Sequence, residues 1–327
     1  MSQNGKRRVY WARTSDGWKI ALHRRQGRKY RLPVVMVHGL ASNFTNMDFP
    51  VAGLSLAQYL YELGFDCWMI DLRGSGLSKR RTLRPLKWYF DDFVFQDLPA
   101  ALNKIRQVTR TKKVHWIGHS LGGLLAFPLY QTYNGGNPLQ SIITVATPMT
   151  TRAKPGYFKY LYRLDGLLRL VPGLPYKPLS KIAALFPEQV LKMEDHILFA
   201  RDNMNKEIIQ SILNHSVESV PSSLILQIHD WFRHNYFSNR DGSINFLEGL
   251  ETISLPILMM VGSIDSFTPA ADIRLAFKKL PNADKTLMSF GKKHGHENDY
   301  GHIDLILGKN APKEVFPHMA KWLEKHD

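Results

Sequence analysis

The sequence has one cysteine and no long hydrophobic run, and both shortages narrow the possible classes of protein. Cys67 is the single cysteine in 327 residues, so a small fold held by internal disulfides is excluded. No stretch approaches the roughly 18 uninterrupted apolar residues of a transmembrane helix. The first residues are polar and basic and lead into an alternating pattern, which gives no sign of a secretory signal peptide. We therefore expect a cytoplasmic protein.

Acidic residues are also scarce relative to basic ones. The chain has 28 Asp and Glu against 43 Lys and Arg, for a formal net charge of +15. The excess is spread along the sequence: residues 6–31 hold ten basic residues against Asp16, and residues 73–87 hold six and no acid. No nucleic-acid-binding motif accompanies these stretches. The charge therefore predicts a solvated basic surface, and it leaves open a weak attraction to an anionic membrane or lipid surface.

Short apolar segments recur along the chain, and each is typical of a buried strand. An alternating pattern over residues 9–25, around Ser15-Asp16-Gly17, predicts an antiparallel hairpin before them. Residues 54–63 and 88–108 have helical spacing, and Asp91, Asp92 and Asp97 are interpreted there as helix caps or solvated charges. Because helices separate the apolar strands, we expect a mostly parallel sheet covered by helices on both faces. The expected buried strands are residues 32–37, 65–70, 114–117, 141–148, 255–262 and 286–290.

About a hundred residues separate the fourth and fifth of these strands, far more than a crossover connection needs. This stretch is rich in aromatic residues and prolines and has helical apolar spacing. We therefore predict a helical cap over residues 151–250, inserted into a core formed by residues 1–150 and 251–327. The cap residues form either a small core of their own or the lining of an apolar groove, with Tyr157, Phe158, Tyr160, Leu161, Trp231 and Phe232 among the candidates.

Ser120 is the candidate nucleophile because of the residues on either side of it. Gly118-His119-Ser120-Leu121-Gly122 follows an apolar strand and precedes an apolar helical segment. In this G-x-S-x-G pattern the strand turns sharply into the helix, so the serine stands exposed at the tip and bulk at either glycine would clash. The Leu121 amide, at the positive end of the helix, and the Leu40 amide, in the glycine-bearing loop after the first apolar strand (residues 32–37), are the expected donors to an oxyanion.

A serine nucleophile needs a base and an acid, and both are expected at the carboxyl ends of strands. Asp265 follows the fifth apolar strand, where its carboxylate can orient an imidazole; the alternative is a capping aspartate. Among the three histidines near the C-terminus, His302 is favoured because it enters an apolar helix, whereas His294 and His296 lie in a charged loop. His38 is interpreted as a packed residue that braces the loop before Leu40.

Two cofactor hypotheses are weak. His294 and His296 are spaced i, i+2 in a loop, which is unspecific for a metal. Gly74 and Gly76 follow a strand, but the third glycine and the acidic partner of a dinucleotide site are missing. We expect no cofactor and no metal.

The order Ser, Asp, His along the chain is that of an α/β-hydrolase. Several further motifs resemble the acid lipase branch of that superfamily, among them His38-Gly39-Leu40, Gly64-Phe65-Asp66-Cys67-Trp68, Arg73-Gly74, Gly118-His119-Ser120 and Tyr300-Gly301-His302-Ile303-Asp304. The resemblance fades between residues 150 and 250. It implies an α/β-hydrolase fold and a serine carboxylester hydrolase with Ser120, Asp265 and His302 as its triad. Leu121 stands where the closest lipases usually carry glutamine.

The expected function is cleavage of carboxylic (acyl) esters, with a small-molecule acyl ester as the substrate, through an acyl-enzyme intermediate. An acyltransferase or polyester-handling enzyme with the same triad is the first alternative, and a non-catalytic ligand-binding hydrolase fold is the second. No nucleic-acid partner is expected.

Overall fold

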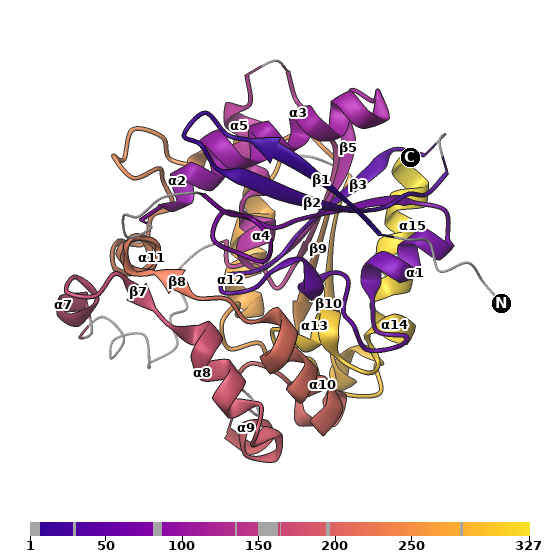
Figure 1. The fold of residues 1–327 in the computed structure, drawn as a ribbon. Helices are drawn as coiled ribbons and strands as arrows, with labels where there is room; N and C mark the ends of the chain where they lie inside the picture. The colour runs from indigo at the N-terminus through magenta and orange to yellow at the C-terminus, as the bar shows by residue number, and fades with distance from the viewer. Residues whose placement is uncertain are drawn as a thin grey trace.

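The computed structural model describes residues 7–28, 31–80, 87–134, 136–149, 163, 165–193, 197–281 and 284–327. Its centre is an eight-stranded sheet in the order β1-β2-β4-β3-β5-β6-β9-β10 (Figure 1). β1 and β2 form the antiparallel hairpin expected from the sequence, and β2 also pairs antiparallel with β4; the remaining neighbours are parallel. The strands are β1 (Arg8–Arg13), β2 (Lys19–Arg25), β3 (Pro33–Val37), β4 (Asp66–Ile70), β5 (Val114–His119), β6 (Leu139–Val145), β9 (Ile257–Gly262) and β10 (Lys285–Phe290).

Alternate residues of the central strands point to opposite faces of the sheet and enter two separate cores. Val35 and Val37 of β3 pack on one face with the helices α3 (Leu98–Thr109) and α12 (Ala270–Lys279). Val34 and Met36 pack on the other face with α1 (Leu56–Glu62) and α15 (Phe316–His326). The expected fold is therefore confirmed: continuous apolar strands are buried on both faces because helices cover both.

Shorter helices complete the core. α3 is the last part of a continuous helical stretch that includes a π-helical segment, Phe93–Asp97. The other helices of the core are α2 (Phe90–Asp92), α4 (Leu121–Leu124), α5 (Ala126–Thr132), α13 (Asp304–Leu307) and α14 (Ala311–Glu314), with 3-10 turns at Phe44–Asn46 and Lys292–His294.

The described residues from 165 to 252, between β6 and β9, form what we call the inserted segment. Figure 1 shows its helices α7, α8, α9, α10 and α11 along the left and lower sides of the molecule. The predicted division between core and cap stays a prediction, and Tyr157, Phe158, Tyr160 and Leu161 lie outside the described residues. The helices are α7 (Asp165–Leu168), α8 (Tyr176–Ala183), α9 (Pro187–Met193), α10 (Lys206–Ser211) and α11 (Ser222–His234), with β7 (Gly173–Leu174) paired to β8 (Val220–Pro221), a π-helical segment at Ile212–Ser216 and 3-10 turns at Arg201–Asn203 and Glu248–Thr252.

The interpretation of Asp97 as a cap or solvated charge is wrong. Its side chain is fully buried, and it accepts hydrogen bonds from the Arg73 guanidinium at 2.8 and 3.0 Å and from the Arg73 amide at 2.9 Å. Arg73 is itself buried and also contacts Asp16 at 2.8 Å. The partner lies 24 positions away, so helical spacing alone did not reveal it. Cys67 is buried, as expected from its place in an apolar strand. None of the described helices is both long and apolar enough to cross a lipid bilayer.

Candidate active site

Ser120 lies at a sharp turn between β5 and α4, with a positive φ of 51°. Such a backbone angle is strained for a residue other than glycine. The Ser120 amide donates to the Val145 carbonyl of the neighbouring strand at 2.8 Å. A Cβ added to Gly118 would lie 2.3 Å from the Gly122 carbonyl, and one added to Gly122 would lie 2.1 Å from the Val37 carbonyl oxygen. The backbone therefore approaches too closely at both positions for any side chain, which is why the turn has glycines there.

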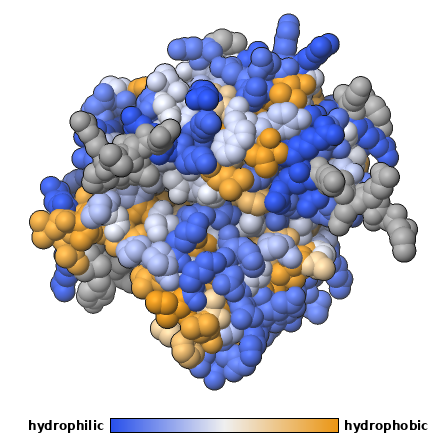
Figure 2. Space-filling view, in the orientation of Figure 1, coloured by the Kyte–Doolittle hydropathy of each residue, from blue (hydrophilic) through white to orange (hydrophobic). Residues whose placement is uncertain are grey.

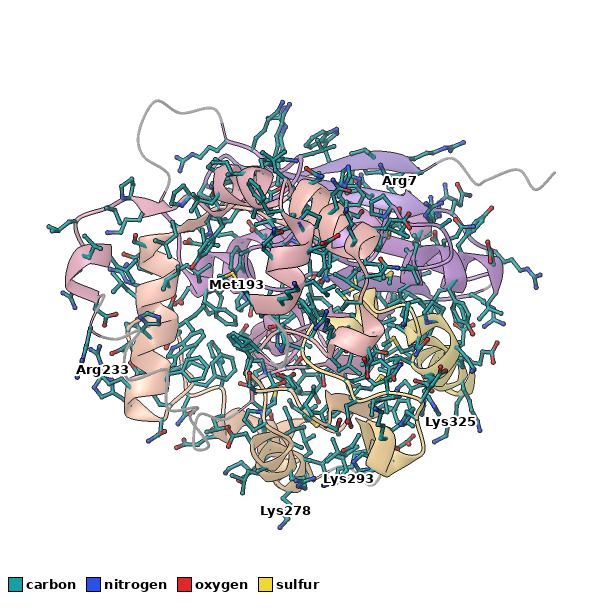
Figure 3. The ribbon with its side chains drawn as sticks, turned by 90° about the horizontal axis from the view of Figure 1, so that it is seen from below. Arg7, Met193, Arg233, Lys278, Lys293 and Lys325 are labelled. Carbon is teal, nitrogen blue, oxygen red and sulfur yellow. The ribbon has the colours of Figure 1, made fainter. Side chains whose placement is uncertain are left out.

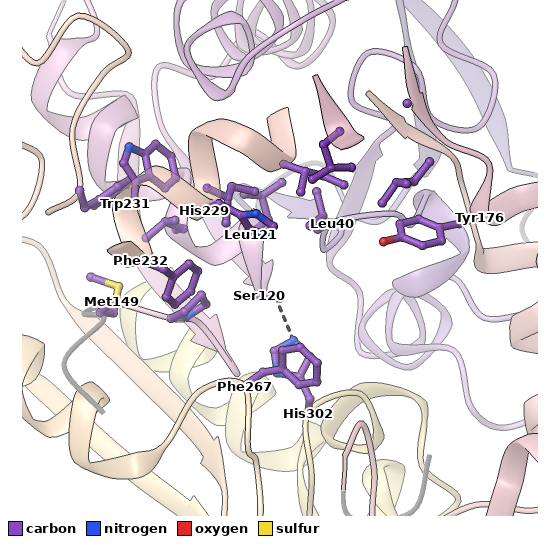
Figure 4. Close-up of a pocket in the computed structure, with 18 of the residues that line it drawn as sticks. Leu40, Ser120, Leu121, Met149, Tyr176, His229, Trp231, Phe232, Phe267 and His302 are labelled. Atoms are coloured by element: carbon purple, nitrogen blue, oxygen red, sulfur yellow. Dashed lines mark hydrogen bonds between the residues drawn. The ribbon is translucent and has the colours of Figure 1, made fainter. Parts of the chain in front are cut away.

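The structure brings Ser120, His302 and Asp265 together from three distant parts of the chain. The Ser120 Oγ lies 2.9 Å from His302 Nε2, the contact drawn as a dashed line in Figure 4. His302 Nδ1 lies 3.0 Å from Asp265 Oδ2 and 3.2 Å from Oδ1. With Nδ1–H donating to the carboxylate, Nε2 is left as an acceptor for the serine hydroxyl. This geometry is the one that activates a serine by general base catalysis.

Asp265 has both of the roles considered for it from the sequence: its carboxylate caps a turn, and it also contacts the His302 imidazole. It is buried, and its Oδ1 accepts hydrogen bonds from the Phe267 amide at 2.9 Å and the Thr268 amide at 2.8 Å. The Thr268 hydroxyl donates to Oδ2. Burial raises the pKa of Asp265, but the facing His302 and the Thr268 donors outweigh burial and hold this pKa below its usual value. The carboxyl therefore stays ionised beside the imidazole.

The loop after β3 lies directly against Ser120. A Cβ added to Gly39 would be 3.3 Å from the Ser120 Cβ. His38 is buried and braces this loop: its Nδ1–H donates to the Gly39 carbonyl at 2.8 Å, and its Nε2 accepts from the Leu72 amide at 3.2 Å. Burial lowers the pKa of His38, in agreement with this neutral tautomer. The sequence therefore predicted the bracing position of His38, and Leu40 follows it at the rim of the Ser120 cavity.

A cavity of about 500 Å³ opens above Ser120. Figure 4 shows that its wall includes Leu40 and Leu121, the two residues whose amides are the expected oxyanion donors. Most of the lining is apolar and comes from the inserted segment, with Ile225, Ile228, Trp231, Phe232 and Phe237 among the residues that contribute. A concave, largely apolar site with a few polar groups at one end is the usual form of a small-molecule pocket.

His119 supports His302, a role that the sequence pattern did not reveal. It is buried, and its Nε2–H donates to the His302 backbone carbonyl at 3.0 Å, while its Nδ1 faces the Asn46 side-chain oxygen at 3.1 Å. Burial lowers the pKa of His119 to about 3, so the ring is neutral near neutral pH. Its place beside Ser120 in the glycine pattern was a signal that could have pointed to it.

The backbone of the His302 loop is also tied to the inserted segment. The His302 amide donates to the Leu198 carbonyl at 2.9 Å. Asp304 is fully buried, and it accepts from the Gly301 amide at 2.8 Å through Oδ1 and from the Asn203 side-chain amide at 2.9 Å through Oδ2. Nothing in the local sequence around Asn203 marks it as a partner of this loop, because the contact spans about a hundred positions.

The two rival histidines lie elsewhere. His294 is exposed, and His296 accepts from the Gly291 amide through Nδ1 at 3.2 Å. Neither belongs to the lining of the Ser120 cavity. Within the described ranges, no cluster of three or more His, Cys, Asp or Glu side chains is arranged to hold a metal ion.

Comparison with known proteins points to hydrolases. The chain is 25% identical to gastric triacylglycerol lipase of Homo sapiens over 95% of this chain and 86% of the relative. It is 24% identical to lysosomal acid lipase/cholesteryl ester hydrolase of Rattus norvegicus over 96% of this chain and 87% of the relative. A thermophilic esterase from Thermogutta terrifontis has a similar fold, with a TM-score of 0.65 and 19% identity over 98% of this chain and all of that one.

A family description, the alpha/beta hydrolase fold, matches residues 33–309. The match begins at β3, ends after α13, and contains Ser120, Asp265 and His302. Because it covers most of the sequence, the chain belongs to the alpha/beta hydrolase fold family, and the resemblance to the acid lipase branch is confirmed.

Proposed function

We propose that this carboxylic ester hydrolase cleaves acyl esters by means of a Ser120–His302–Asp265 triad and an acyl-enzyme intermediate. The observation that carries the proposal is the contact of 2.9 Å between Ser120 Oγ and His302 Nε2 at the base of an apolar cavity. The names of the lipase and esterase relatives support ester hydrolysis as the reaction class.

In the first half of the reaction, His302 Nε2 takes the hydroxyl proton as Ser120 Oγ attacks the ester carbonyl carbon. Asp265 stabilises the imidazolium that forms. The carbonyl oxygen becomes negatively charged and is held by the Leu40 and Leu121 amides, one such donor contributing on the order of 3 kcal/mol. The tetrahedral intermediate then collapses: the alcohol leaves with the proton from His302, and the acyl group remains on Ser120.

In the second half, water attacks the acyl-enzyme with His302 again acting as the base. The proton goes to His302 and from there to Ser120 Oγ as the carboxylic acid leaves. Atoms balance without a metal or cofactor, since one water is consumed and one ester yields one acid and one alcohol.

The apolar wall of the cavity supports an acyl chain as the part of the substrate that enters it. Each buried methylene contributes about 0.8 kcal/mol of binding free energy. The proposed substrates are therefore esters with an aliphatic acyl group, a class that includes the lipid substrates named for the relatives.

The test is hydrolysis of p-nitrophenyl esters by the wild type and by Ser120→Ala. We expect Ser120→Ala to lower kcat by at least about a thousandfold, because the covalent step is lost. A fluorophosphonate probe should label the wild type once per chain and leave Ser120→Ala unlabelled. Thermal unfolding of both proteins is the control for folding, and retained ester turnover by a folded Ser120→Ala protein would refute the nucleophile assignment.

A further inference from the structure

Large apolar side chains are exposed together on the inserted segment. Of the sixteen large hydrophobic residues that are exposed in the described part of the chain, nine lie between positions 167 and 197. Figure 2 shows orange surface at the lower end of the molecule, over α8 and α9, and at its left edge, over α7. An apolar patch of this kind marks an interaction site, whereas scattered single residues do not. The α8–α9 ridge is our name for Leu179, Ile182, Leu185, Phe186 and Met193, which are between 54% and 72% exposed.

Helix α8 attaches to the protein by its polar side. Ser180 is its one buried residue, and the Ser180 hydroxyl donates at 2.9 Å to a carbonyl of Ile212–Ser216. Lys181 donates to a carbonyl of the same segment, and the Lys177 ammonium contacts the Glu218 carboxylate at 2.9 Å. A surface helix of a globular protein normally has the reverse orientation, with its apolar face towards the core. The apolar face of α8 is thus directed away from the molecule.

The ridge continues to the mouth of the Ser120 cavity. Tyr176 begins α8, is 38% exposed and also lines the cavity, where Figure 4 shows it beyond Leu40. Leu167 of α7 is 59% exposed and lines the same cavity. Tyr176 therefore places the first turn of α8 at the edge of the cavity, and the ridge begins three residues further along this helix.

The charge of the chain favours one occupant for this surface. Two copies of a chain with a net charge of +15 repel each other, which disfavours the ridge as a dimer contact. A bilayer with anionic headgroups offers an apolar interior for the ridge and negative charge for the basic surface. Figure 3 views the molecule from below and shows Met193 near the centre of that view, with basic residues towards its outline: Arg233, Lys278, Lys293 and Lys325.

We infer that the chain docks on an anionic lipid bilayer through the α8–α9 ridge, which turns the mouth of the Ser120 cavity towards the lipid. The inference rests on the proposed function in one respect, namely that an acyl ester from the lipid enters the Ser120 cavity. Docking itself needs no ester hydrolysis, so the two can fail separately.

The experiment measures cosedimentation with vesicles made of equal amounts of phosphatidylcholine and phosphatidylglycerol. The Ser120→Ala protein is used, so that no lipid is hydrolysed during the measurement. We expect it to bind these vesicles and to bind pure phosphatidylcholine more weakly. Adding Leu179→Ser, Ile182→Ser and Phe186→Ser should weaken binding by at least about tenfold, because three inserted apolar side chains are lost.

A matched control replaces three apolar residues outside the inserted segment by serine: Val9, Leu63 and Leu275, each 38% exposed. This control should bind vesicles as the Ser120→Ala protein does. With Ser120 restored, both triple variants should hydrolyse a water-soluble acetyl ester at the wild-type rate, which shows that they fold.

The inference is overturned if the Ser120→Ala protein does not bind the mixed vesicles, or if the ridge and control variants bind them equally. It is also overturned if sedimentation without lipid shows a dimer that the ridge substitutions dissociate, since a second copy would then be the occupant. Binding as expected, with no ester turnover by the wild type, would leave the docking surface in place and remove the proposed function.

Discussion

Narrowing the cavity at Ile228 should shorten the acyl chain that the enzyme accepts. Ile228 lies on α11, is half-buried and lines the Ser120 cavity. Leu226 lies two positions earlier on the same helix and is also half-buried, but it does not line this cavity. The two residues therefore allow the same substitution to be made on either side of one helix.

The magnitude follows from the free energy of burying methylenes. At about 0.8 kcal/mol for each CH₂, kcat/KM of the wild type should rise about fourfold per methylene until the cavity is filled. Replacing isoleucine by tryptophan adds roughly six heavy atoms to a densely packed wall, which excludes several methylenes of the substrate. Exclusion of two of them should lower kcat/KM for the longer esters by about 16-fold, while the acetyl ester should be affected by no more than about twofold.

The assay is a series of p-nitrophenyl esters, from acetyl to palmitoyl, hydrolysed by the wild type, Ile228→Trp and Leu226→Trp. We expect Ile228→Trp to move the optimum to shorter chains and Leu226→Trp to leave the profile unchanged. Thermal unfolding identifies any variant that is merely destabilised. An equal loss on all esters with Ile228→Trp, or the same shift with both variants, would refute the placement of the acyl chain in this cavity.

Four further predictions concern the site and its support. Asp265→Asn should lower kcat by about 10³- to 10⁴-fold in the ester assay, because the imidazole loses the partner that fixes its tautomer. Gly122→Ala should lower the free energy of unfolding, measured in urea, by about 2 kcal/mol or more, because the added Cβ would lie 2.1 Å from a backbone oxygen. Gly166→Ala is the control: its Cβ would meet no atom within 4 Å, so the free energy of unfolding should hardly change. Asn203→Leu should lower the free energy of unfolding by about 2 kcal/mol and lower kcat more than it changes KM, because the buried carboxyl group of Asp304 loses one of its hydrogen-bond donors. Between pH 6.5 and about 3 the unfolded His119 takes up a proton and the buried one does not, so this residue lowers the free energy of unfolding by about 1.4 kcal/mol for each unit that the pH falls. His119→Gln should remove this contribution from the pH dependence of the free energy of unfolding. Equal slopes for the wild type and the variant would contradict a neutral His119.

Much of the fold was predictable because its signals are local. Continuous apolar segments indicated the buried strands. Gly118 and Gly122, each two residues from Ser120, indicated the sharp turn. One local difference favoured His302 over His294: an apolar helical segment follows His302, whereas charged loop residues surround His294. The structure brings His302 to Ser120 and leaves His294 exposed.

Features that depend on distant partners were missed. Asp97 has the spacing of a helix cap, and only the position of Arg73 in the fold shows that it is a buried partner of that guanidinium. Helix α8 has the amphipathic pattern of an ordinary surface helix, and the sequence gives no sign that Ser180 faces inward while Leu179 and Ile182 face outward. In both cases the pattern identifies a helix but does not indicate what lies beside it.

Sheet topology explains why Ser120 and Asp265 meet, but it does not explain His302. β5 and β9 are parallel strands separated by β6 alone, so the residues that follow them lie at one edge of the sheet. His302 lies twelve residues beyond the last residue of β10, Phe290, and its backbone is held by Leu198 and His119 rather than by a strand. The inserted segment therefore does more than cover the cavity, since it supplies one of the two contacts that fix the histidine backbone. Substitutions in that segment can then lower turnover through His302 without contacting the substrate. Asn203 lies in the same segment and donates to Asp304, two residues after His302. This is the physical reason for expecting kcat rather than KM to change in Asn203→Leu.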